Sequence, residues 1–138
     1  MLNLGKLPLH HIAIKGTNVP LLEQFYNRVL GLKVDDVQRH TSGTKRSVWL
    51  KSEKIIIMLE EIETNQQPLP QKSSVAEKPG LHLLAFEIAR HEREQWKKRL
   101  DLHGVTIDAE SEFSIYFRDP EGNALALTHY PDPIGEAA

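Results

Sequence analysis

The chain has 138 residues, no cysteine and a formal net charge of −2. That length fits one domain with a substantial core, and a content of 40% hydrophobic and 26% charged residues is typical of globular proteins rather than disordered ones. The lack of cysteine excludes disulfides, thiolate nucleophiles and cysteine-based zinc sites, and the near-neutral charge gives no reason to expect a nucleic-acid partner.

The first half of the chain begins with a predicted strand and a predicted helix. In residues 9–14, LHHIAI, the period-2 alternation places Ile12 on one face and His11 on the other. Apolar residues at helical spacing follow, with Pro20 near their start and Gly31 as a natural C-terminal stop. The apolar positions of this helix are Leu21, Leu22, Phe25, Tyr26, Val29 and Leu30.

Three further strands are predicted after that helix. They are the short runs at residues 31–37, 47–51 and 57–60. The segment of about residues 61–80 then breaks the pattern, because it is rich in Pro, Gln, Ser and Lys. This composition predicts an exposed linker.

The second half repeats the first half in the same order, which is the signature of an internal duplication. Residues 81–86 (LHLLAF) correspond to 9–14, residues 114–118 (SIYFR) to 47–51 (SVWLK), and residues 125–128 (LALT) to 57–60 (IMLE). Between the first two matches lies a charged helix with Leu100 on its apolar face and Gly104 after its end, followed by a strand at 105–109. Each half is therefore predicted to form a strand, a helix and three strands.

These elements predict an α+β fold of two βαβββ copies within a single domain, residues 1–138. Copy one spans about residues 7–62 and copy two about residues 80–131. The bulky aliphatic strand faces are expected to pack on outer helices, and the smaller, mixed faces to line a cavity in a cupped mixed sheet. The charge is unevenly divided, because residues 1–60 carry nine Lys/Arg and five Asp/Glu, whereas residues 81–138 carry six and eleven.

Two motifs resemble the vicinal-oxygen-chelate superfamily, which includes glyoxalases, bleomycin-resistance proteins and dioxygenases. The first is LHHIAI at 9–14, followed by FY at 25–26 and LGL at 30–32. The second is YFRDPEGN at 116–123, in which Pro and Gly suit a tight turn between the last two strands. The resemblance covers about residues 8–130, and it implies the cupped fold and the pairing of subunits into a homodimer.

The resemblance also implies where metal-dependent relatives hold a catalytic ion. The ligand positions correspond to His11, Met58, Leu83 and Ala126 in this chain. Only the imidazole among these side chains suits such a metal, and a catalytic site normally needs three protein ligands. We therefore predict no metal cofactor. The residues available for a displaced metal site are His11, His82, and Glu60 or Glu87.

The predicted ligand-binding residues belong to the smaller faces of the strands. They are His11, Trp49, Met58, Leu83, Ser114, Tyr116 and Ala126. Ser114 and Tyr116 are similar to a Ser-x-Tyr pair that contacts the phosphonate in fosfomycin-resistance members of the superfamily. Structural alternatives stay open: a hydrogen-bonded former ligand for His11, core packing for Trp49 and an ordinary inward strand residue for Tyr116.

Three hypotheses about function follow from these residues. The first, which we favour, is metal-free binding of a small organic molecule, aromatic or anionic, in the cup of a homodimer. The second is a metal-dependent lyase, isomerase or thiol transferase of the glyoxalase type with a displaced metal site. The third is a metal-free enzyme with His11 or Tyr116 as its acid–base group. The sequence leaves open whether the protein is an enzyme.

The chain also predicts where the protein resides. No stretch approaches the roughly 18 consecutive apolar residues of a membrane span, and the first residues lack the apolar region of a secretion signal. We therefore expect a cytoplasmic protein with a small-molecule ligand and no membrane partner.

Overall fold

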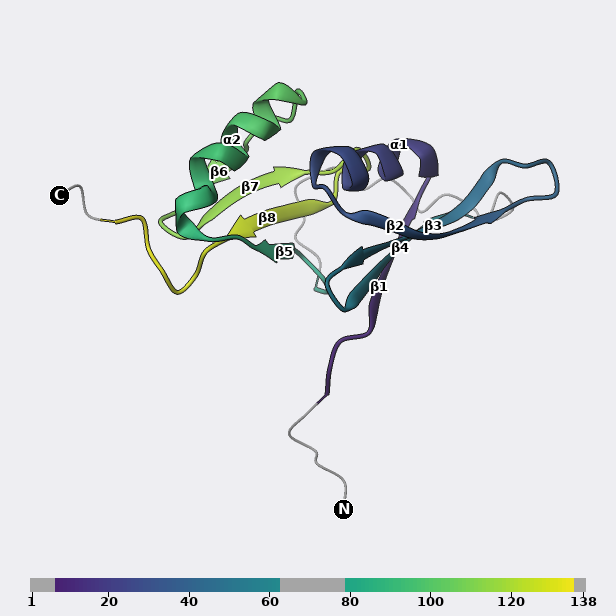
Figure 1. Ribbon diagram of the computed structural model, residues 1–138, viewed down its shortest axis with the longest axis horizontal. Coiled ribbons are helices and arrows are strands. Elements are labelled where there is room, and N and C mark those ends of the chain that lie inside the picture. Colours follow the sequence, from purple (N-terminus) through teal and green to yellow (C-terminus); the bar gives the residue numbers. More distant parts are fainter. Residues whose placement is uncertain (1–6, 63–78, 136–138) are drawn as a thin grey trace, which may run out of the picture. The chain divides into compact units, whose positions relative to one another are not determined.

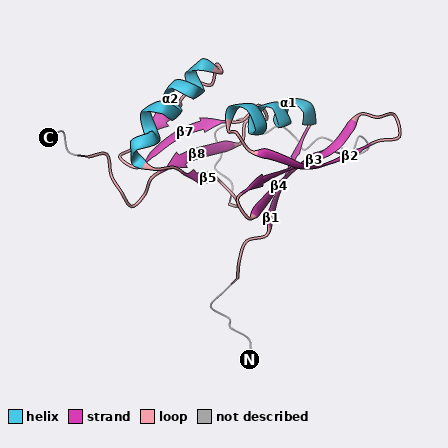
Figure 2. Ribbon diagram, viewed as in Figure 1, coloured by secondary structure: helices cyan, strands magenta, loops and turns pink. Residues whose placement is uncertain are grey.

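The computed structural model describes residues 7–62 and 79–135, and the chain divides into two compact units, residues 1–66 and 67–138 (Figure 1). Each unit contains one four-stranded mixed sheet and a helical segment (Figure 2). This is the α+β architecture of two βαβββ copies that the sequence predicts. The predicted linker of about residues 61–80 lies largely outside the described residues. In the described part of the chain, no helix is long and apolar enough to cross a membrane.

Unit 1, residues 1–66, has the strand order β1-β4-β3-β2. Its elements are β1 (His11–Gly16), α1 (Val19–Gln24), the π-helical η1 (Phe25–Val29), β2 (Lys33–Arg39), β3 (Lys45–Ser52) and β4 (Ile55–Glu61). β1 runs parallel to β4, whereas the β4-β3 and β3-β2 pairs are antiparallel. Parallel neighbours cannot be joined by a hairpin, and the connection between β1 and β4 includes α1.

The helix of unit 1 begins and ends close to where its sequence predicts. The side chain of Asn18 accepts a hydrogen bond from the backbone N–H of Leu21 at 3.1 Å, and a proline occupies the first turn. The helix then widens into the π-helical η1, in which the backbone N–H of Leu30 donates to the Phe25 carbonyl at 3.1 Å. Gly31 adopts φ 80°, the left-handed conformation that ends helices. Because Gly31 still belongs to this helix end, the strand predicted at 31–37 is displaced and starts at Lys33.

Unit 2, residues 67–138, has the strand order β5-β8-β7-β6. Its elements are β5 (Leu84–Glu87), the 3-10 helix η2 (Arg90–Glu92), α2 (Arg93–Leu102), β6 (Ala109–Glu110), β7 (Ser114–Arg118) and β8 (Ala124–Thr128). β5 is parallel to β8, and the remaining pairs are antiparallel. Strands β5 to β8 therefore correspond in order and direction to β1 to β4.

The β7–β8 hairpin closes through the Asp-Pro-Glu-Gly-Asn turn. The Asp119 carboxylate accepts hydrogen bonds from the backbone N–H groups of Glu121 and Asn123, both at 2.9 Å. Gly122 has φ 87°, a conformation that residues with a Cβ rarely adopt. The motif thus forms the tight turn that the sequence predicts.

The strand predicted at residues 105–109 is much shorter than expected. It is reduced to β6, Ala109–Glu110. The chain before it stays attached to the end of α2, since the backbone N–H of Val105 donates to the Leu100 carbonyl at 2.8 Å. Val105, which the apolar pattern predicts to begin a strand, is therefore bonded to the end of the helix instead.

The strand faces that carry bulky aliphatic residues form the core of each unit. In unit 1 these are Val48, Leu50, Ile57 and Leu59, together with Leu22 and Tyr26 of the helix, all at most 1% exposed. In unit 2 they are Ile115, Phe117, Leu125 and Leu127, with Leu100 of α2, again at most 1% exposed. Burial of each such side chain contributes about 1.5–3 kcal/mol. Among the residues that the structure describes, the opposite face of each sheet carries no helix of its own unit, and we call it the open face.

Candidate functional site

The open face of unit 1 carries three rows of side chains across its strands. The register places Ala13, Met58, Trp49 and Asp36 in the middle row. One flanking row consists of His11, Ile56, Lys51 and Lys33, and the other of Lys15, Glu60, Ser47 and Gln38. Met58 and Trp49 therefore form an apolar strip between two polar rows.

Trp49 is held in place at the centre of this face. Its Nε1–H donates to the Oγ of Ser47 at 2.9 Å, and Ser47 is itself only 3% exposed. The indole is half-buried and lies beside Met58, its cross-strand partner. A ring that is already oriented loses little conformational entropy when a ligand packs against it.

His11 lies at the start of β1 and is exposed. Its Nδ1 is 3.0 Å from the Nδ1 of His10, and the two rings are nearly perpendicular at 87°. One of these nitrogens must carry the proton that the two share. The Nε2 of His11 has no hydrogen-bond partner among the described residues, so it is available to a ligand.

The open face of unit 2 carries smaller side chains in the equivalent places. Its middle row consists of Ala85, Ala126, Tyr116 and Ala109. Ala126 is 1% exposed, and the buried Ser114 donates from its Oγ to the Oγ1 of Thr128 at 2.8 Å. Tyr116 is half-buried, and within the described ranges its hydroxyl has no partner. Leu83 precedes β5 and is 41% exposed. Tyr116 is thus more available to a ligand than Ser114, whose hydroxyl hydrogen is already donated.

Of the four positions at which the family resemblance implies metal ligands, only that of His11 carries an imidazole or a carboxylate. Met58 lies opposite Trp49, and Ala126 lies opposite Tyr116, so the register makes these two positions equivalent. Leu83 is likewise aliphatic. Catalytic sites for the divalent ions concerned use imidazole and carboxylate groups, which thioether and alkyl side chains cannot replace.

The residues named for a displaced metal site are far apart within each unit. Glu60 on β4 is the Cα partner of Lys15 on β1. Lys15 lies four residues beyond His11, so the Cα atoms of His11 and Lys15 are about 13 Å apart along the strand. His82 and Glu87 are five residues apart, about 16 Å in an extended chain. Within either unit, no three His, Asp or Glu side chains of the described residues cluster as a metal site requires. Neither unit by itself therefore brings together the residues named for a displaced metal site.

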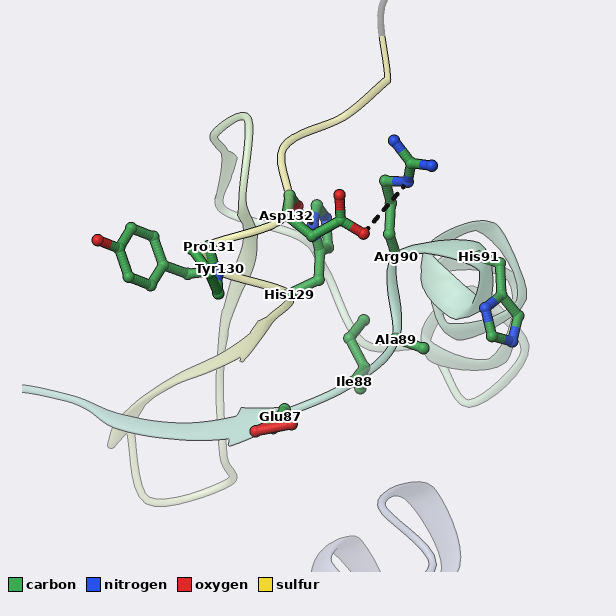
Figure 3. A pocket seen from close by; sticks show the side chains of 9 residues that line it. All are labelled: Glu87, Ile88, Ala89, Arg90, His91, His129, Tyr130, Pro131 and Asp132. Carbon is green, nitrogen blue, oxygen red and sulfur yellow. Dashed lines mark hydrogen bonds and ion pairs between the residues drawn. The ribbon is translucent and has the colours of Figure 1, made fainter.

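A pocket of about 300 Å³ lies in unit 2, between the end of β5 and the chain that follows β8 (Figure 3). It is lined by Glu87, Ile88, Ala89, Arg90, His91, His129, Tyr130, Pro131 and Asp132. The Arg90 Nε lies 3.5 Å from a carboxylate oxygen of Asp132, whereas the side chains of Tyr130 and His91 point away from the centre (Figure 3). Of the residues predicted for a displaced metal site, only Glu87 belongs to this lining, and few groups converge on a ligand here.

A buried polar network adjoins this pocket. Arg93 is 5% and His129 3% exposed, and the Nη1 of Arg93 lies 2.8 Å from the Nε2 of His129. Arg93 also donates to the Glu110 carboxylate at 3.0 Å and to the Ser111 carbonyl at 2.9 Å. Hydrogen bonds from Arg93 and then from Lys97 hold the pKa of Glu110 below its ordinary value. Sequence reasoning missed this network, because an arginine in a charged helix is ordinarily solvated.

The chain matches one family model and many solved structures. The model described as Glyoxalase/Bleomycin resistance protein/Dioxygenase superfamily matches residues 8–127. A glyoxalase/dioxygenase from Nostoc punctiforme superposes with a TM-score of 0.75 at 20% sequence identity, covering 96% of this chain and 97% of that chain. A glyoxalase family protein from Enterococcus faecalis gives 0.69 at 23% identity, covering 88% and 97%.

A lactoylglutathione lyase from Agrobacterium tumefaciens is also similar, with a TM-score of 0.64 at 21% identity, covering 89% of this chain and 93% of that chain. At these identities the structural likeness shows the fold alone. No curated protein sequence matches the chain.

Proposed function

Because the chain belongs to the Glyoxalase/Bleomycin resistance protein/Dioxygenase superfamily, we propose that it binds a small organic molecule on the open faces of its sheets without a catalytic metal ion. The proposal depends on Met58, Leu83 and Ala126, which occupy positions at which the family resemblance implies metal ligands but whose side chains are a thioether and two alkyl groups. The single imidazole of His11 does not hold a catalytic divalent ion, since such sites normally need three protein ligands. A protein that only sequesters a small molecule needs a surface that binds the molecule but needs no catalytic metal.

The two open faces differ in what each would offer to a ligand. Met58 and Trp49 offer apolar and aromatic surface in unit 1, and Leu83, 41% exposed, offers apolar surface in unit 2, where Ala126 is only 1% exposed. On the open face of unit 1 the Nε2 of His11 would orient a ligand by a hydrogen bond, and on that of unit 2 the hydroxyl of Tyr116 would do so. Ligand sites in proteins commonly combine a mostly apolar lining with a few such polar groups.

The proposal is tested by a thermal-shift screen of the chelator-treated protein. We expect at least one compound among antibiotics, thiols and 2-oxo compounds to raise the melting temperature, because a ligand that binds only the folded state stabilises it. His11→Ala and Tyr116→Phe should reduce that shift, and His91→Ala, an exposed histidine whose side chain points away from the pocket of unit 2, is the matched control. A screen in which no compound shifts the chelator-treated protein would count against the proposal.

A metal-dependent lyase, isomerase or thiol transferase is the alternative that metal analysis would detect. The strand spacings within each unit do not favour a site built from His11 with Glu60, or from His82 with Glu87. Near-stoichiometric Ni, Zn, Mn or Fe in the purified protein, lost in His11→Ala, would replace our proposal with this alternative. Turnover that persists in chelator and disappears in Tyr116→Phe would instead indicate a metal-free enzyme.

We also propose that the protein is a cytoplasmic homodimer. The family resemblance supports the pairing of subunits. The strands β1 and β5 support it further, since each is an edge strand with one partner in its sheet, and unpaired edges favour association. Sedimentation equilibrium should give twice the chain mass of 15.7 kDa. A single species at the chain mass over the whole concentration range would rule out the dimer.

A further inference from the structure

We infer that the open face of unit 1 binds a planar molecule that carries a carboxylate or a phosphate, with the anionic group between Lys33 and Lys51 and the ring against Trp49. This inference rests on the proposed function and deepens it, because it names the class of molecule that this face would take.

The first observation is a pair of lysines that face each other across two strands. Lys33 of β2 and Lys51 of β3, which we call the lysine pair, are Cα partners in the register. Their side chains therefore leave the same face of the sheet with their Cβ atoms about 5 Å apart. Like charges directly opposite each other destabilise an antiparallel pair.

The lysine pair is only partly neutralised by the protein. A carboxylate oxygen of Asp35 lies 3.5 Å from the Nζ of Lys51. Lys33 has no ion-pair partner among the residues that the structure describes. An anion bound between the two ammonium groups would remove their repulsion and accept a charge-assisted hydrogen bond from each.

Trp49 supplies a surface for the rest of the ligand. It precedes Lys51 by two residues on β3, so both side chains leave the open face with their Cα atoms about 7 Å apart. The hydrogen bond to Ser47 holds the indole in place, and Met58 lies directly opposite it on β4. A ring stacked on the indole would place its anionic substituent about one ring length away, toward the lysine pair.

The acidic side chains of this face lie outside the row that contains the lysine pair. Asp36, in the middle row, accepts a hydrogen bond from the backbone N–H of Val37 at 2.9 Å. Glu60 is in the far flanking row, where its Cα partner on β1 is Lys15. The row that contains the lysine pair instead begins with His11. The fourth member of that row is Ile56, so the row contains no carboxylate.

Unit 2 has no equivalent of the lysine pair among its described residues. Arg118 takes the place of Lys51, but its Nη1 donates to the Gly122 carbonyl at 2.7 Å and its Nε lies 3.6 Å from the Asp108 carboxylate. The strand that would carry a second cation is too short, because β6 consists of Ala109–Glu110 alone. The anionic group is therefore assigned to unit 1.

The test uses the full chain with Trp96→Phe, which leaves Trp49 as the only tryptophan. The probes are 2-naphthoate, 2-naphthyl phosphate, the neutral 2-naphthylmethanol and the cationic 2-naphthylmethylamine. Binding is followed by the indole N–H signal of Trp49 in ¹H–¹⁵N NMR and by calorimetry. We expect one of the anions to bind about tenfold more tightly than the neutral probe, and the amine more weakly still. The better of the two anions identifies carboxylate or phosphate as the recognised group.

Substitutions in the lysine pair locate the anionic group. Lys33→Ala and Lys51→Ala should each weaken the anion about fivefold and leave the neutral probe unchanged. Lys98→Ala, which removes one exposed charge from α2, is the matched control and should change neither. Added salt should shrink the preference for the anion, since exposed charges are screened.

The outcomes separate this inference from the proposed function. Equal binding of anion and neutral probe, or an anion preference that survives both lysine substitutions, would overturn the ligand class and leave small-molecule binding intact. If no probe bound and no compound in the thermal-shift screen raised the melting temperature, both the ligand class and the proposed function would be wrong. Two other outcomes would also refute the inference. In one, the Trp49 signal responds only to a single-stranded oligonucleotide; in the other, a second copy of the chain covers the Trp49 side chain at every protein concentration.

Discussion

The two units share one strand order but carry different chemistry at equivalent positions of their open faces. Trp49 and Met58 in unit 1 correspond to Tyr116 and Ala126 in unit 2. The larger side chains of unit 1 are half-buried, whereas Ala126 is buried. The two copies therefore differ in the chemical character of the face that we assign to the ligand, whereas the face that builds the core is apolar in both.

The polar groups of the two units differ in the same direction. In unit 2, Arg93, His129 and Ser114 are buried and hydrogen-bonded to their own unit. In unit 1, Lys33 and His11 are exposed at the ends of one row. This contrast teaches that two copies with the same backbone can place side chains at equivalent positions and still use them for different purposes. One copy here uses its polar groups mainly for stability, and the other keeps them accessible.

The largest effect should come from breaking the network of unit 2. Arg93→Ala would leave His129 and the Ser111 carbonyl without a donor, so the free energy of unfolding should fall by about 2–4 kcal/mol in chemical denaturation. Leu21→Ala, in the first turn of α1 and 46% exposed, is the control and should cost about 0.5 kcal/mol. If the two variants were equally stable, the polar network would not be what holds unit 2.

Exchanging the residues at one equivalent position should give the next largest effect. Ala126→Met places a long side chain at a position that is 1% exposed, and overpacking should destabilise the protein by about 1–3 kcal/mol. Met58→Ala should have a smaller effect on the melting temperature but should weaken ligand binding, because Met58 is half-buried on the open face. Thermal melting with and without a screened ligand measures both. If Ala126→Met and Met58→Ala lowered the melting temperature equally, the proposed difference between the open faces of the two units would be wrong.

The two equivalent serines should separate stability from ligand binding. Ser47→Ala removes the acceptor of the Trp49 Nε1–H and should cost about 1 kcal/mol while shifting the indole N–H signal in NMR. Ser114→Ala removes the donor to Thr128 at a similar cost and should leave that signal in place. An unmoved indole signal in Ser47→Ala would mean that packing, rather than the hydrogen bond, orients the ring.

The smallest effect should be a dependence of stability on pH that arises in unit 2. The pKa of Glu110 is lowered in the folded state from 4.5, so its contribution is present above that pH and is lost as the pH falls toward the folded-state value. Glu110→Gln should lower the free energy of unfolding at neutral pH by less than about 1 kcal/mol, because the side chain is 40% exposed and its ion pairs are screened. The difference from wild type should shrink on acidification.

The control for that titration is Glu112→Gln, an exposed carboxyl of the same unit. It should leave the free energy of unfolding at neutral pH within about 0.5 kcal/mol of the wild-type value. A Glu110→Gln defect that grows as the pH falls would have the wrong sign for a lowered pKa.

The features that could be predicted from the sequence depend on local patterns. The alternation around Ile57 and Leu59 identifies the core face, because strand side chains alternate whatever the neighbouring strands are. Gly31 and the turn at Asp119 mark the helix end and the hairpin through torsions and side-chain hydrogen bonds that lie within a few residues. The repeat and the family follow from these elements.

The features that could not be predicted depend on register and on distant contacts. Lys33 faces Lys51 only because β2 starts late and has an irregularity in register between Val34 and Asp36. Arg93 meets His129 across 36 positions of the chain. No periodicity in the sequence encodes either contact, so the lysine pair and the network could be found only in the structure.

The hydrogen bonds of His129 have a consequence for its reactivity. A guanidinium group only donates, so the contact with Arg93 requires the Nε2 of His129 to be the lone-pair nitrogen, and the ring proton must sit on Nδ1, facing the Asp132 carbonyl. Both nitrogens are thereby occupied, and an acylating reagent such as diethyl pyrocarbonate can attack this ring only after Arg93 has moved away. The rate of labelling of His129, relative to the exposed His91, would then report how often this end of unit 2 opens under native conditions.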